Sequence, residues 1–596
     1  MLHATRSTSD PLSESGPRSQ SRGAVSSQPG AHSPCRQRCR KRSIKFSNLA
    51  AATKKSITGQ KRAQCAKIKI GNSPASLRVH TQMTDSTQSP TYLADPIHES
   101  ILIQEHERLI IDSPMFQRLR KIRQLGNVFL LFPGALHTRF EHSIGVMHIA
   151  GQYFDALFRR IRSESNEVSK ALDNVRRVVR LAGLLHDIGH GPFSHLYESF
   201  LSKRTARDLL RKDEDTKADL SIPKSWFETI ENTKRQEWCE RKLEHEHYSC
   251  AIISYIVKSL HESSEAPANY YYDGIDQDIC SLLDETIPST GRFDSWLSEL
   301  ATPKGGILAG ANTESLKRCL HAIISSDFDA DKLDYLQRDA YYCGIKSNAI
   351  DLHYIFNSIQ IAKDGKNICY VSIPQKLIPS FEHVLIIRRQ MYARVYMHRV
   401  NSTFDHLLLQ ALNNVFQEKQ DSTFVNNAID FLSRTDDWLI EQAFIVASTA
   451  AKKIDKNLDG LTKAELASLM YFTRTMPVKV LEKIIPLVEK SEHEILFKAH
   501  CEATGVKDPE IVSPKIKELT NTLRDGIKSD RPEDGIFRVE SSLKKVEPTN
   551  IGYKSDVLHS SLWRDATVRL IAFQSLKESA MDSKRNLTRR VRLRFG

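Results

Sequence analysis

Four residues of metal-ligand type lie far apart in the sequence, and the fold must bring them together if they are to act as one site. They are His142, the adjacent pair His186 and Asp187, and Asp331. Imidazole nitrogen and carboxylate oxygen together suit a divalent first-row metal that keeps coordination positions open. An ion held in this way lowers the pKa of water to near neutrality, so the ligand set is typical of a hydrolase.

The pattern around these residues predicts a mainly α fold. An apolar stripe from Val175 to Leu185 predicts a helix that ends at His186 and Asp187, where Gly189 and Gly191 allow the backbone to turn. A helix over 112–126 is predicted from Asp112 as its cap and the Pro that follows. Further helices are predicted over 143–161, 380–416 and 426–500, and the best candidate for a short strand is 367–373.

Length and cysteine usage bound the class of protein. A chain of 596 residues can bury a large core and more than one domain. It has no run of eighteen apolar residues, which argues against a membrane-spanning helix. Its 10 cysteines are scattered rather than paired, which favours reduced thiols and an intracellular, cytoplasmic location.

The positive charge belongs to the N-terminal end. Residues 1–82 hold 16 Lys and Arg against 2 Asp and Glu, whereas the remainder holds 69 against 70. We interpret residues 1–90 as a disordered basic tail, because they are polar and poor in aromatic residues. An organelle-targeting peptide and a nuclear or nucleic-acid-binding arm are the alternatives. Residues 202–244 are also highly charged, and we interpret them as a surface insertion.

Spacing excludes two other metal motifs and suggests a phosphate substrate. The run from Asp327 begins like a calcium loop, but Lys332 and Arg338 occupy the positions that need Gly and Glu. His245-Glu-His247 lacks the second His of a zinc-protease helix at 249. Arg139, Lys332 and Arg388 lie within or near the motif segments, and such cations are suited to phosphate oxygens.

The longer strings around these residues resemble those of the HD-domain phosphohydrolases, and within them the deoxynucleoside triphosphate (dNTP) triphosphohydrolases. The chain is similar to bacterial members and to the catalytic core of the animal sterile-alpha-motif-and-HD-containing enzymes. The matching strings run in family order over about residues 92–410: Asp95–His98, Phe116–Gly126, Phe132–Gly145, Ala182–His195, His245-Glu246 and Asp329–Asp339.

This resemblance implies roles for individual residues. The metal ligands would be His142, His186, Asp187 and Asp331, and the groups that handle protons and orient water would be His190, His195, Glu198 and His245. Arg139, Lys332 and Arg388 would contact the triphosphate, while Gln124, Tyr335 and Asp339 would lie at the sugar. Asp112, Gln117 and Arg120 match positions that bind an activating guanine nucleotide in regulated relatives.

The sequence therefore predicts a tail over 1–90, an HD phosphohydrolase domain over 91–410 and a helical C-terminal region over 411–596. The expected reaction splits a dNTP into deoxynucleoside and triphosphate, with Mn, Mg, Fe or Zn as the metal. The expected partners are dNTPs, an activating nucleotide and further copies of the chain, with no membrane. The alternatives are an HD-type phosphodiesterase or nucleotidase, and a nucleic-acid-binding protein with an inactive core. One departure from the family is Glu99, which stands where Gly is usual.

Overall fold

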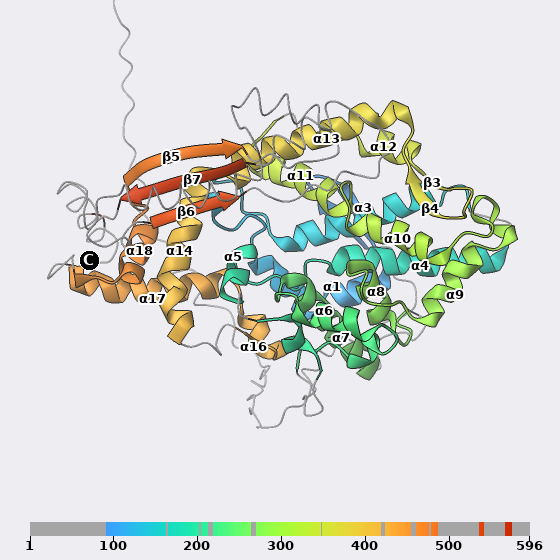
Figure 1. Ribbon diagram of the computed structural model, residues 1–596, viewed down its shortest axis with the longest axis horizontal. Coiled ribbons are helices and arrows are strands. Elements are labelled where there is room, and N and C mark those ends of the chain that lie inside the picture. Colours follow the sequence, from blue (N-terminus) through green and yellow to red (C-terminus); the bar gives the residue numbers. More distant parts are fainter. Residues whose placement is uncertain are drawn as a thin grey trace, which may run out of the picture. The chain divides into compact units, whose positions relative to one another are not determined.

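The computed structural model describes residues 91–475, apart from 162–164, 202–203, 212–218, 264–269, 347–348, 419–423 and 455–459, and also 478–486, 536–541, 567–574 and 590. The predicted tail over 1–90 lies outside the described residues. The helices have the following bounds: α1 (Glu105–Ile111), α2 (Pro114–Gln117), α3 (Arg139–Leu157), α4 (Asn166–Leu185), α5 (His195–Glu198), α6 (Asn232–Glu240), α7 (His245–Glu262), α8 (Ile275–Leu283), α9 (Gly291–Leu300), α10 (Thr313–Ile324), α11 (Ala330–Tyr342), α12 (Leu352–Ser358), α13 (Ile378–Met391), α14 (Arg399–Glu418), α16 (Ala428–Ser433), α17 (Asp436–Ile454) and α18 (Lys463–Phe472) (Figure 1).

Short 3-10 turns and one π-helical segment connect these helices: η1 (Arg118–Lys121), η2 (Gly126–Leu130), η3 (Ser199–Leu201), η4 (Ala206–Leu209), η5 (Lys224–Phe227), η6 (Pro303–Leu308), η7 (Gln375–Leu377) and the π-helical η8 (Tyr392–Tyr396). The predicted mainly α fold is confirmed.

The strands of the described residues form three small antiparallel sheets. β1 (Thr91–Asp95) pairs with β2 (Glu99–Ile103), and β3 (Gln360–Lys363) pairs with β4 (Cys369–Ser372), which falls within the strand predicted over 367–373. The third sheet has the order β5 (Val478–Pro486), β7 (Thr567–Gln574) and β6 (Ile536–Ser541). The sequence predicted a helix through residue 500 and a helical C-terminal region over 411–596. Both predictions are wrong for the residues of these three strands. Their sequences are rich in β-branched residues, which favour a pleated strand.

Helices α3 and α4 pack against each other at the centre of the described fold, with α11 on α3 and with α8 and α9 on α4. The apolar stripe of α4 is buried as its spacing predicts, from Val175 to Leu185. Contact between α3 and α11 is close because Gly145 has no side chain: a Cβ there would lie 2.1 Å from a carboxylate oxygen of Asp334. This close approach brings the first turns of α3 and α11, and the last turn of α4, to one region.

Two local predictions are wrong. The helix expected over 112–126 is only the single turn α2 followed by η1, and its cap is Ser113 rather than Asp112, because Ser113 Oγ accepts from the amide of Phe116 at 3.3 Å. The segment 202–244 is not only a surface insertion, since it buries Trp226, Phe227 and Trp238. The high charge of the segment suggested an exposed surface, but its aromatic residues bury large apolar side chains against the fold.

Glu99, which replaces the usual glycine of the family, has a backbone conformation that favours glycine. Glu99 begins β2 directly after the β1–β2 turn and has φ of 61°, in the left-handed region that favours glycine. Glycine, which is usual here in the family, would suit this backbone better than the glutamate of this chain.

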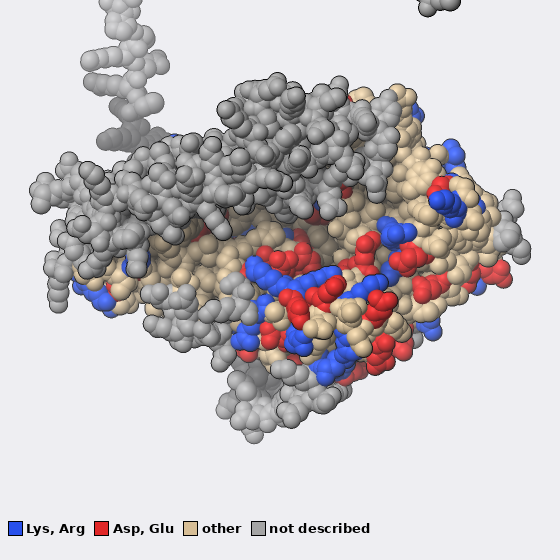
Figure 2. Space-filling model, in the orientation of Figure 1, with Lys and Arg blue, Asp and Glu red and all other residues tan. Residues whose placement is uncertain are grey.

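Charges of both signs are interspersed on the face of the molecule that Figure 2 presents. This agrees with the near balance of acidic and basic residues after position 82. Among the described residues, none of the helices combines the length and the apolar character needed to cross a bilayer.

A buried ion pair attaches the N-terminal hairpin and α1 to α4. Arg180 Nη2 donates to Glu107 Oε2 at 2.9 Å, and the two side chains are 6% and 0% exposed. Glu107 also accepts from the amide of Gln104 at 2.9 Å, which closes the first turn of α1. One carboxylate therefore stabilises both the start of α1 and its contact with α4.

We expect Glu107→Gln to lower the free energy of unfolding by about 3–5 kcal/mol, because it leaves the Arg180 guanidinium buried without a counter-charge. Asp155→Asn is the matched control: it removes the carboxylate of the more exposed pair with Arg176, and we expect a loss of about 0–1 kcal/mol. Chemical denaturation measures both. Equal effects of the two variants would show that burial of the Glu107 pair is unimportant.

Candidate active site

A reciprocal cap fixes where α3 begins. Thr138 and Glu141 form a capping box, in which the amide of Thr138 donates to Glu141 Oε2 at 3.0 Å. The helix therefore starts at Arg139, and both Arg139 and His142 lie in its first turn. They are three residues apart, so they share a face of this helix, which spans Arg139–Leu157 rather than the predicted 143–161.

His186 and Asp187 lie at the C-terminal end of α4, where His186 is the C-cap residue. The turn that follows is held by α7: Ser249 Oγ donates to the carbonyl of His186 at 2.7 Å and accepts from the amide of Gly189 at 3.0 Å. A Cβ on Gly189 would lie 2.1 Å from the carbonyl oxygen of His245. Glycine at 189 therefore allows α7 to approach the end of α4.

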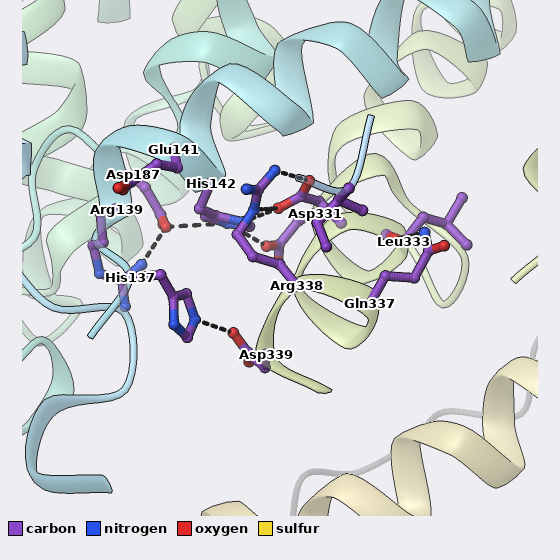
Figure 3. Close-up of polar contacts among 12 residues, drawn as sticks. His137, Arg139, Glu141, His142, Asp187, Asp331, Leu333, Gln337, Arg338 and Asp339 are labelled. Atoms are coloured by element: carbon purple, nitrogen blue, oxygen red, sulfur yellow. Dashed lines mark hydrogen bonds and ion pairs between the residues drawn. The ribbon is translucent and has the colours of Figure 1, made fainter. Parts of the chain in front are cut away.

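The structure brings the four predicted metal ligands together, and Figure 3 shows His142, Asp187 and Asp331 among them. His142 Nε2 lies 3.5 Å from Asp187 Oδ2 and 3.0 Å from Asp331 Oδ1, and His186 Nε2 lies 3.7 Å from the same Asp331 oxygen. His142, His186 and Asp187 each offer a ligand atom within 4.8 Å of the others, so the group could hold a metal ion. Asp331 reaches the group from the first turn of α11, whose N-cap is Asp329.

The two imidazoles have the tautomer that a metal ligand needs. His142 Nδ1 lies 2.8 Å from Asp334 Oδ2, and His186 Nδ1 lies 2.8 Å from the carbonyl oxygen of Gly183. A carbonyl oxygen and an ionised carboxylate only accept, so both Nδ1 atoms carry the proton and both Nε2 atoms face the cluster. Neither Nε2 has a hydrogen-bond partner of good geometry. The donor set therefore fits a divalent cation.

The electrostatics of the cluster also favour a positive charge at His142. Burial lowers its pKa, but Asp331 and Asp334 more than offset this and raise the pKa to about 10. Burial would raise the pKa of Asp187, yet Arg139 and the neighbouring histidines hold it well below its usual range. Carboxylates that hold a proton at Nε2 can equally hold a cation there, and binding the cation then releases the proton.

A second group of side chains lies beside Asp187. His190 Nε2 is 3.2 Å from Asp187 Oδ1, and the rings of His190 and His245 stack with centroids 3.6 Å apart. Glu198 joins the two remaining members, since its carboxylate oxygens lie 2.6 Å from His245 Nδ1 and 3.0 Å from His195 Nδ1. The side chain of His195 is 67% exposed. The four residues predicted to handle protons therefore adjoin one another, with His195 facing solvent.

The predicted phosphate contacts are held in different ways. Arg139 donates to Ser194 Oγ at 2.8 Å through Nε and to Asp187 through Nη1. Lys332 Nζ donates to Asp329 Oδ2 at 2.6 Å, and Asp329 and Asp331 raise the pKa of Lys332 although burial opposes this. Arg388 of α13 is 9% exposed. All three side chains are therefore largely removed from bulk water.

The residues predicted at the sugar are placed by a second network. Asp339 accepts from the Tyr396 hydroxyl at 2.6 Å and lies 2.8 Å from His137 Nε2. Gln124 Oε1 is buried and has no hydrogen-bond partner among the described residues. Tyr335 packs edge-on against Tyr396, with ring centroids 6.2 Å apart. The sequence did not single out His137 or Tyr396 as site residues, although both orient Asp339.

The positions that correspond to an activator site have local partners. Gln117 Nε2 donates to the carbonyl of Ile111 at 2.7 Å, and Gln117 Oε1 accepts from Arg120 Nε at 2.8 Å. Arg120 also lies over the ring of Phe140, 3.4 Å from its centroid. Asp112 ends α1 as its C-cap residue and is exposed. These contacts stabilise the α1–α2 corner, so a nucleotide site here stays a prediction.

The residues that hold the ligand His142 in place were not predicted from the sequence. Asp334 receives two hydrogen bonds from Arg338, at 2.8 and 2.9 Å, and lies 2.6 Å from His98 Nε2. Arg338 also donates to Asp95 at 2.7 Å, and its side chain is fully buried. A signal was present, because Asp331, Asp334 and Arg338 are spaced three and four apart and so share one helix face.

Comparison with known proteins shows what the chain is similar to. The family model described as the HD domain matches residues 139–283. The chain is 27% identical over 378 residues to the "Deoxynucleoside triphosphate triphosphohydrolase SAMHD1 homolog" of Dictyostelium discoideum, which covers 63% of this chain and 59% of that protein. It is also 27% identical to "Deoxynucleoside triphosphate triphosphohydrolase SAMHD1" of Gallus gallus, over 74% of this chain and 65% of that one. The resemblance to HD-domain dNTP triphosphohydrolases predicted from the sequence is thereby confirmed.

The matches with these two relatives span less than two thirds of the relatives' own length. A crystal structure of a hypothetical protein from Aquifex aeolicus aligns with a TM-score of 0.49 at 20% identity, covering 85% of this chain and 100% of that chain.

We expect Asp334→Asn to weaken the binding of Mn²⁺ by about 10- to 100-fold, because His142 loses the carboxylate that orients its ring and holds the Nδ1 proton. Titration calorimetry on the purified protein measures the affinity. Asp339→Asn is the matched control, since it alters a buried carboxylate of the same helix that faces a different histidine, and it should leave the affinity unchanged. Unaltered Mn²⁺ binding by Asp334→Asn would contradict the assignment of His142 as a ligand.

Proposed function

We propose that the protein is a metal-dependent phosphohydrolase that splits dNTPs into deoxynucleoside and inorganic triphosphate. The observation that carries the proposal is the pair of imidazoles, His142 and His186, whose Nδ1 atoms have acceptor partners and whose Nε2 atoms face Asp187 and Asp331. The names of the two relatives support the choice of dNTP as substrate. His142, His186, Asp187 and Asp331 would hold the ion, which when bound would supply Lewis acidity and a water of lowered pKa.

The chain's own cations would bind the triphosphate. Charge builds on the phosphoryl oxygens as the bond to phosphorus breaks, and preorganised donors stabilise it without having to reorient. Arg139 is fixed on the hydroxyl of Ser194 and lies beside Asp187, so its guanidinium is held at the ligand cluster. Lys332 and Arg388 would bind the other phosphate oxygens from α11 and α13.

Proton transfer would use the histidines around Glu198. The leaving 5′-oxygen of the deoxynucleoside needs a proton, and His195 or His245 would donate it. Glu198 contacts Nδ1 of both rings, so it fixes their orientation. Burial lowers the pKa of His245, but the hydrogen bond to Glu198 and the charges of the nearby carboxylates together more than offset this and raise it. Burial would raise the pKa of Glu198, but hydrogen bonds from His195 and His245 lower it, so the carboxylate stays ionised.

The sugar would be recognised by Gln124, Asp339 and Tyr335. The unpartnered Oε1 of Gln124 and the side-chain oxygens of Asp339 would accept hydrogen bonds from a 3′-hydroxyl. The ring of Tyr335 would occupy the space that a 2′-hydroxyl needs. An activating nucleotide at Asp112, Gln117 and Arg120, and assembly of several copies of the chain, complete the proposal.

We expect the purified protein with Mn²⁺ or Mg²⁺ to release deoxynucleoside and intact triphosphate from a dNTP, and Asp187→Ala or Asp331→Ala to abolish the reaction because the ion is lost. Chromatography of the products, with each of the four dNTPs alone and with GTP added, measures both. Asp155→Asn, which alters a carboxylate distant from the ligands, should keep the wild-type rate and metal content. Release of a monophosphate, or of phosphate from a monophosphate or cyclic nucleotide, would instead favour the phosphodiesterase or nucleotidase alternative.

We expect Tyr335→Ala to lower the preference for dGTP over GTP, measured as the ratio of kcat/KM, by about 10- to 100-fold, because removing the ring makes room for the 2′-hydroxyl. Tyr354→Ala changes an exposed tyrosine of α12 and should leave the ratio unaltered. Should Tyr335→Ala discriminate as well as the wild type, the sugar would be recognised by other residues.

A further inference from the structure

The turn between α4 and α5 contains two consecutive residues with left-handed backbone, neither of which is glycine. Phe193 and Ser194 both have φ of 54°, and Ser194 has ψ of −120°. Such conformations are strained for residues that carry a side chain, and they persist only where the surroundings fix them. His190 precedes this turn and His195 follows it directly, so its geometry sets where two proposed proton-handling residues lie.

The carboxylate that fixes the turn comes from outside the part of the chain that matches the HD domain. Asp436 is the first residue of α17 and is 1% exposed. Its Oδ1 accepts from the amide of Phe193 at 2.8 Å, and its Oδ2 accepts from the amide of Arg123 at 3.0 Å. Each oxygen therefore satisfies a backbone amide in a different segment.

These two segments meet at Arg139. The backbone of Arg123 pairs with Thr138, and the amide of Arg139 donates to the carbonyl of Ile122 at 2.9 Å. From the other side, Ser194 accepts from Arg139 Nε at 2.8 Å. The Asp436 carboxylate thus holds both the segment that starts α3 and the turn that fixes the guanidinium.

A simpler role for Asp436 is to stabilise the start of its own helix, where negative charge is favourable. The hydrogen bonds favour a different role. The hydroxyl of Thr435 already accepts from the amide of Trp438 in the first turn of α17, at 3.4 Å. Both oxygens of Asp436 bind amides of other segments instead.

On the basis of the function proposed above, we propose that Asp436 is a positioning residue for the reaction. It holds the 193–194 turn against the 122–124 segment, so that Arg139 and His195 keep the relative placement that phosphoryl transfer needs. It touches neither the ligands nor the substrate groups named above, and apart from an ion pair of 3.4 Å between its Oδ2 and Arg123 Nη1 it acts through the backbone. Placement errors of about 1 Å can cost about 100-fold in rate, which sets the size of effect that this role allows.

The test compares Asp436→Asn with Asp278→Asn. The asparagine at 436 has one acceptor oxygen for two backbone amides, so one contact is lost. Asp278 is a matched control, because it is also buried and accepts from a backbone amide, that of Thr290 at 2.6 Å, but it belongs to α8 and binds the start of α9. Both variants should lower the Tm. Hydrogen exchange, metal content, kcat and KM are then measured on each, at a temperature where both are folded.

For Asp436→Asn we expect faster amide exchange in the peptide 190–198, unchanged metal content and a fall in kcat of about 10- to 100-fold with a smaller change in KM. For Asp278→Asn we expect wild-type exchange in that peptide and wild-type kcat. Unchanged exchange in 190–198, a kcat of Asp436→Asn within twofold of the wild type, or an equal loss of kcat in both variants would overturn the proposal.

If Asp436→Asn does not fold, Asp436→Glu replaces it, since it keeps the charge and both acceptors but displaces them by one methylene, and the same outcomes apply. A wild-type protein that hydrolyses no dNTP would refute the proposed function. The exchange comparison would then decide the positioning role by itself.

Discussion

The ion pair between Asp334 and Arg338 is the interaction on which the rest of the site depends. Arg338 neutralises Asp334 inside the fold, and Asp334 in turn binds the imidazole of His142. Removing either partner would leave a charge without compensation in a region that excludes water. The pair also joins α3 to α11 and to Asp95 in the N-terminal hairpin. The hairpin, α3 and α11 therefore meet at this one ion pair.

Sequence periodicity identified the parts of the fold that are governed by local rules. The helix that presents His186 was predicted because α4 is amphipathic and ends at glycines. The start of α3 was predicted four residues too late, at 143, although Thr138 and Glu141 form a capping box. The same rules failed at α2, where capping residues alone suggested a long helix although the segment ends after one turn and η1. A cap indicates where a helix begins, whereas its length depends on packing that a single sequence does not contain.

For the site, residue chemistry and the family resemblance identified the groups that would touch metal and substrate, and the structure places them in one region. The residues behind them were not identified, because their partners lie far away in the sequence. Asp334 is close to His98 and His142 only after α11 packs on α3, and Asp436 meets Phe193 across 243 residues. Pairings of this range depend on the fold as a whole, and the spacing of one segment cannot predict them.

The two ends of the segment 202–244 lie side by side. Arg204 and Leu243 are joined by a backbone hydrogen bond of 3.0 Å, and Thr205 pairs with Lys242. Glu198 lies just before this segment and His245 just after it, and the two side chains are in direct contact. Because the two ends are held together and loop-closure entropy grows only slowly with length, the exposed turns of this segment can change length at little cost, whereas Trp226, Phe227 and Trp238 must stay packed. Such a change in an exposed turn would leave Glu198 and His245 in contact.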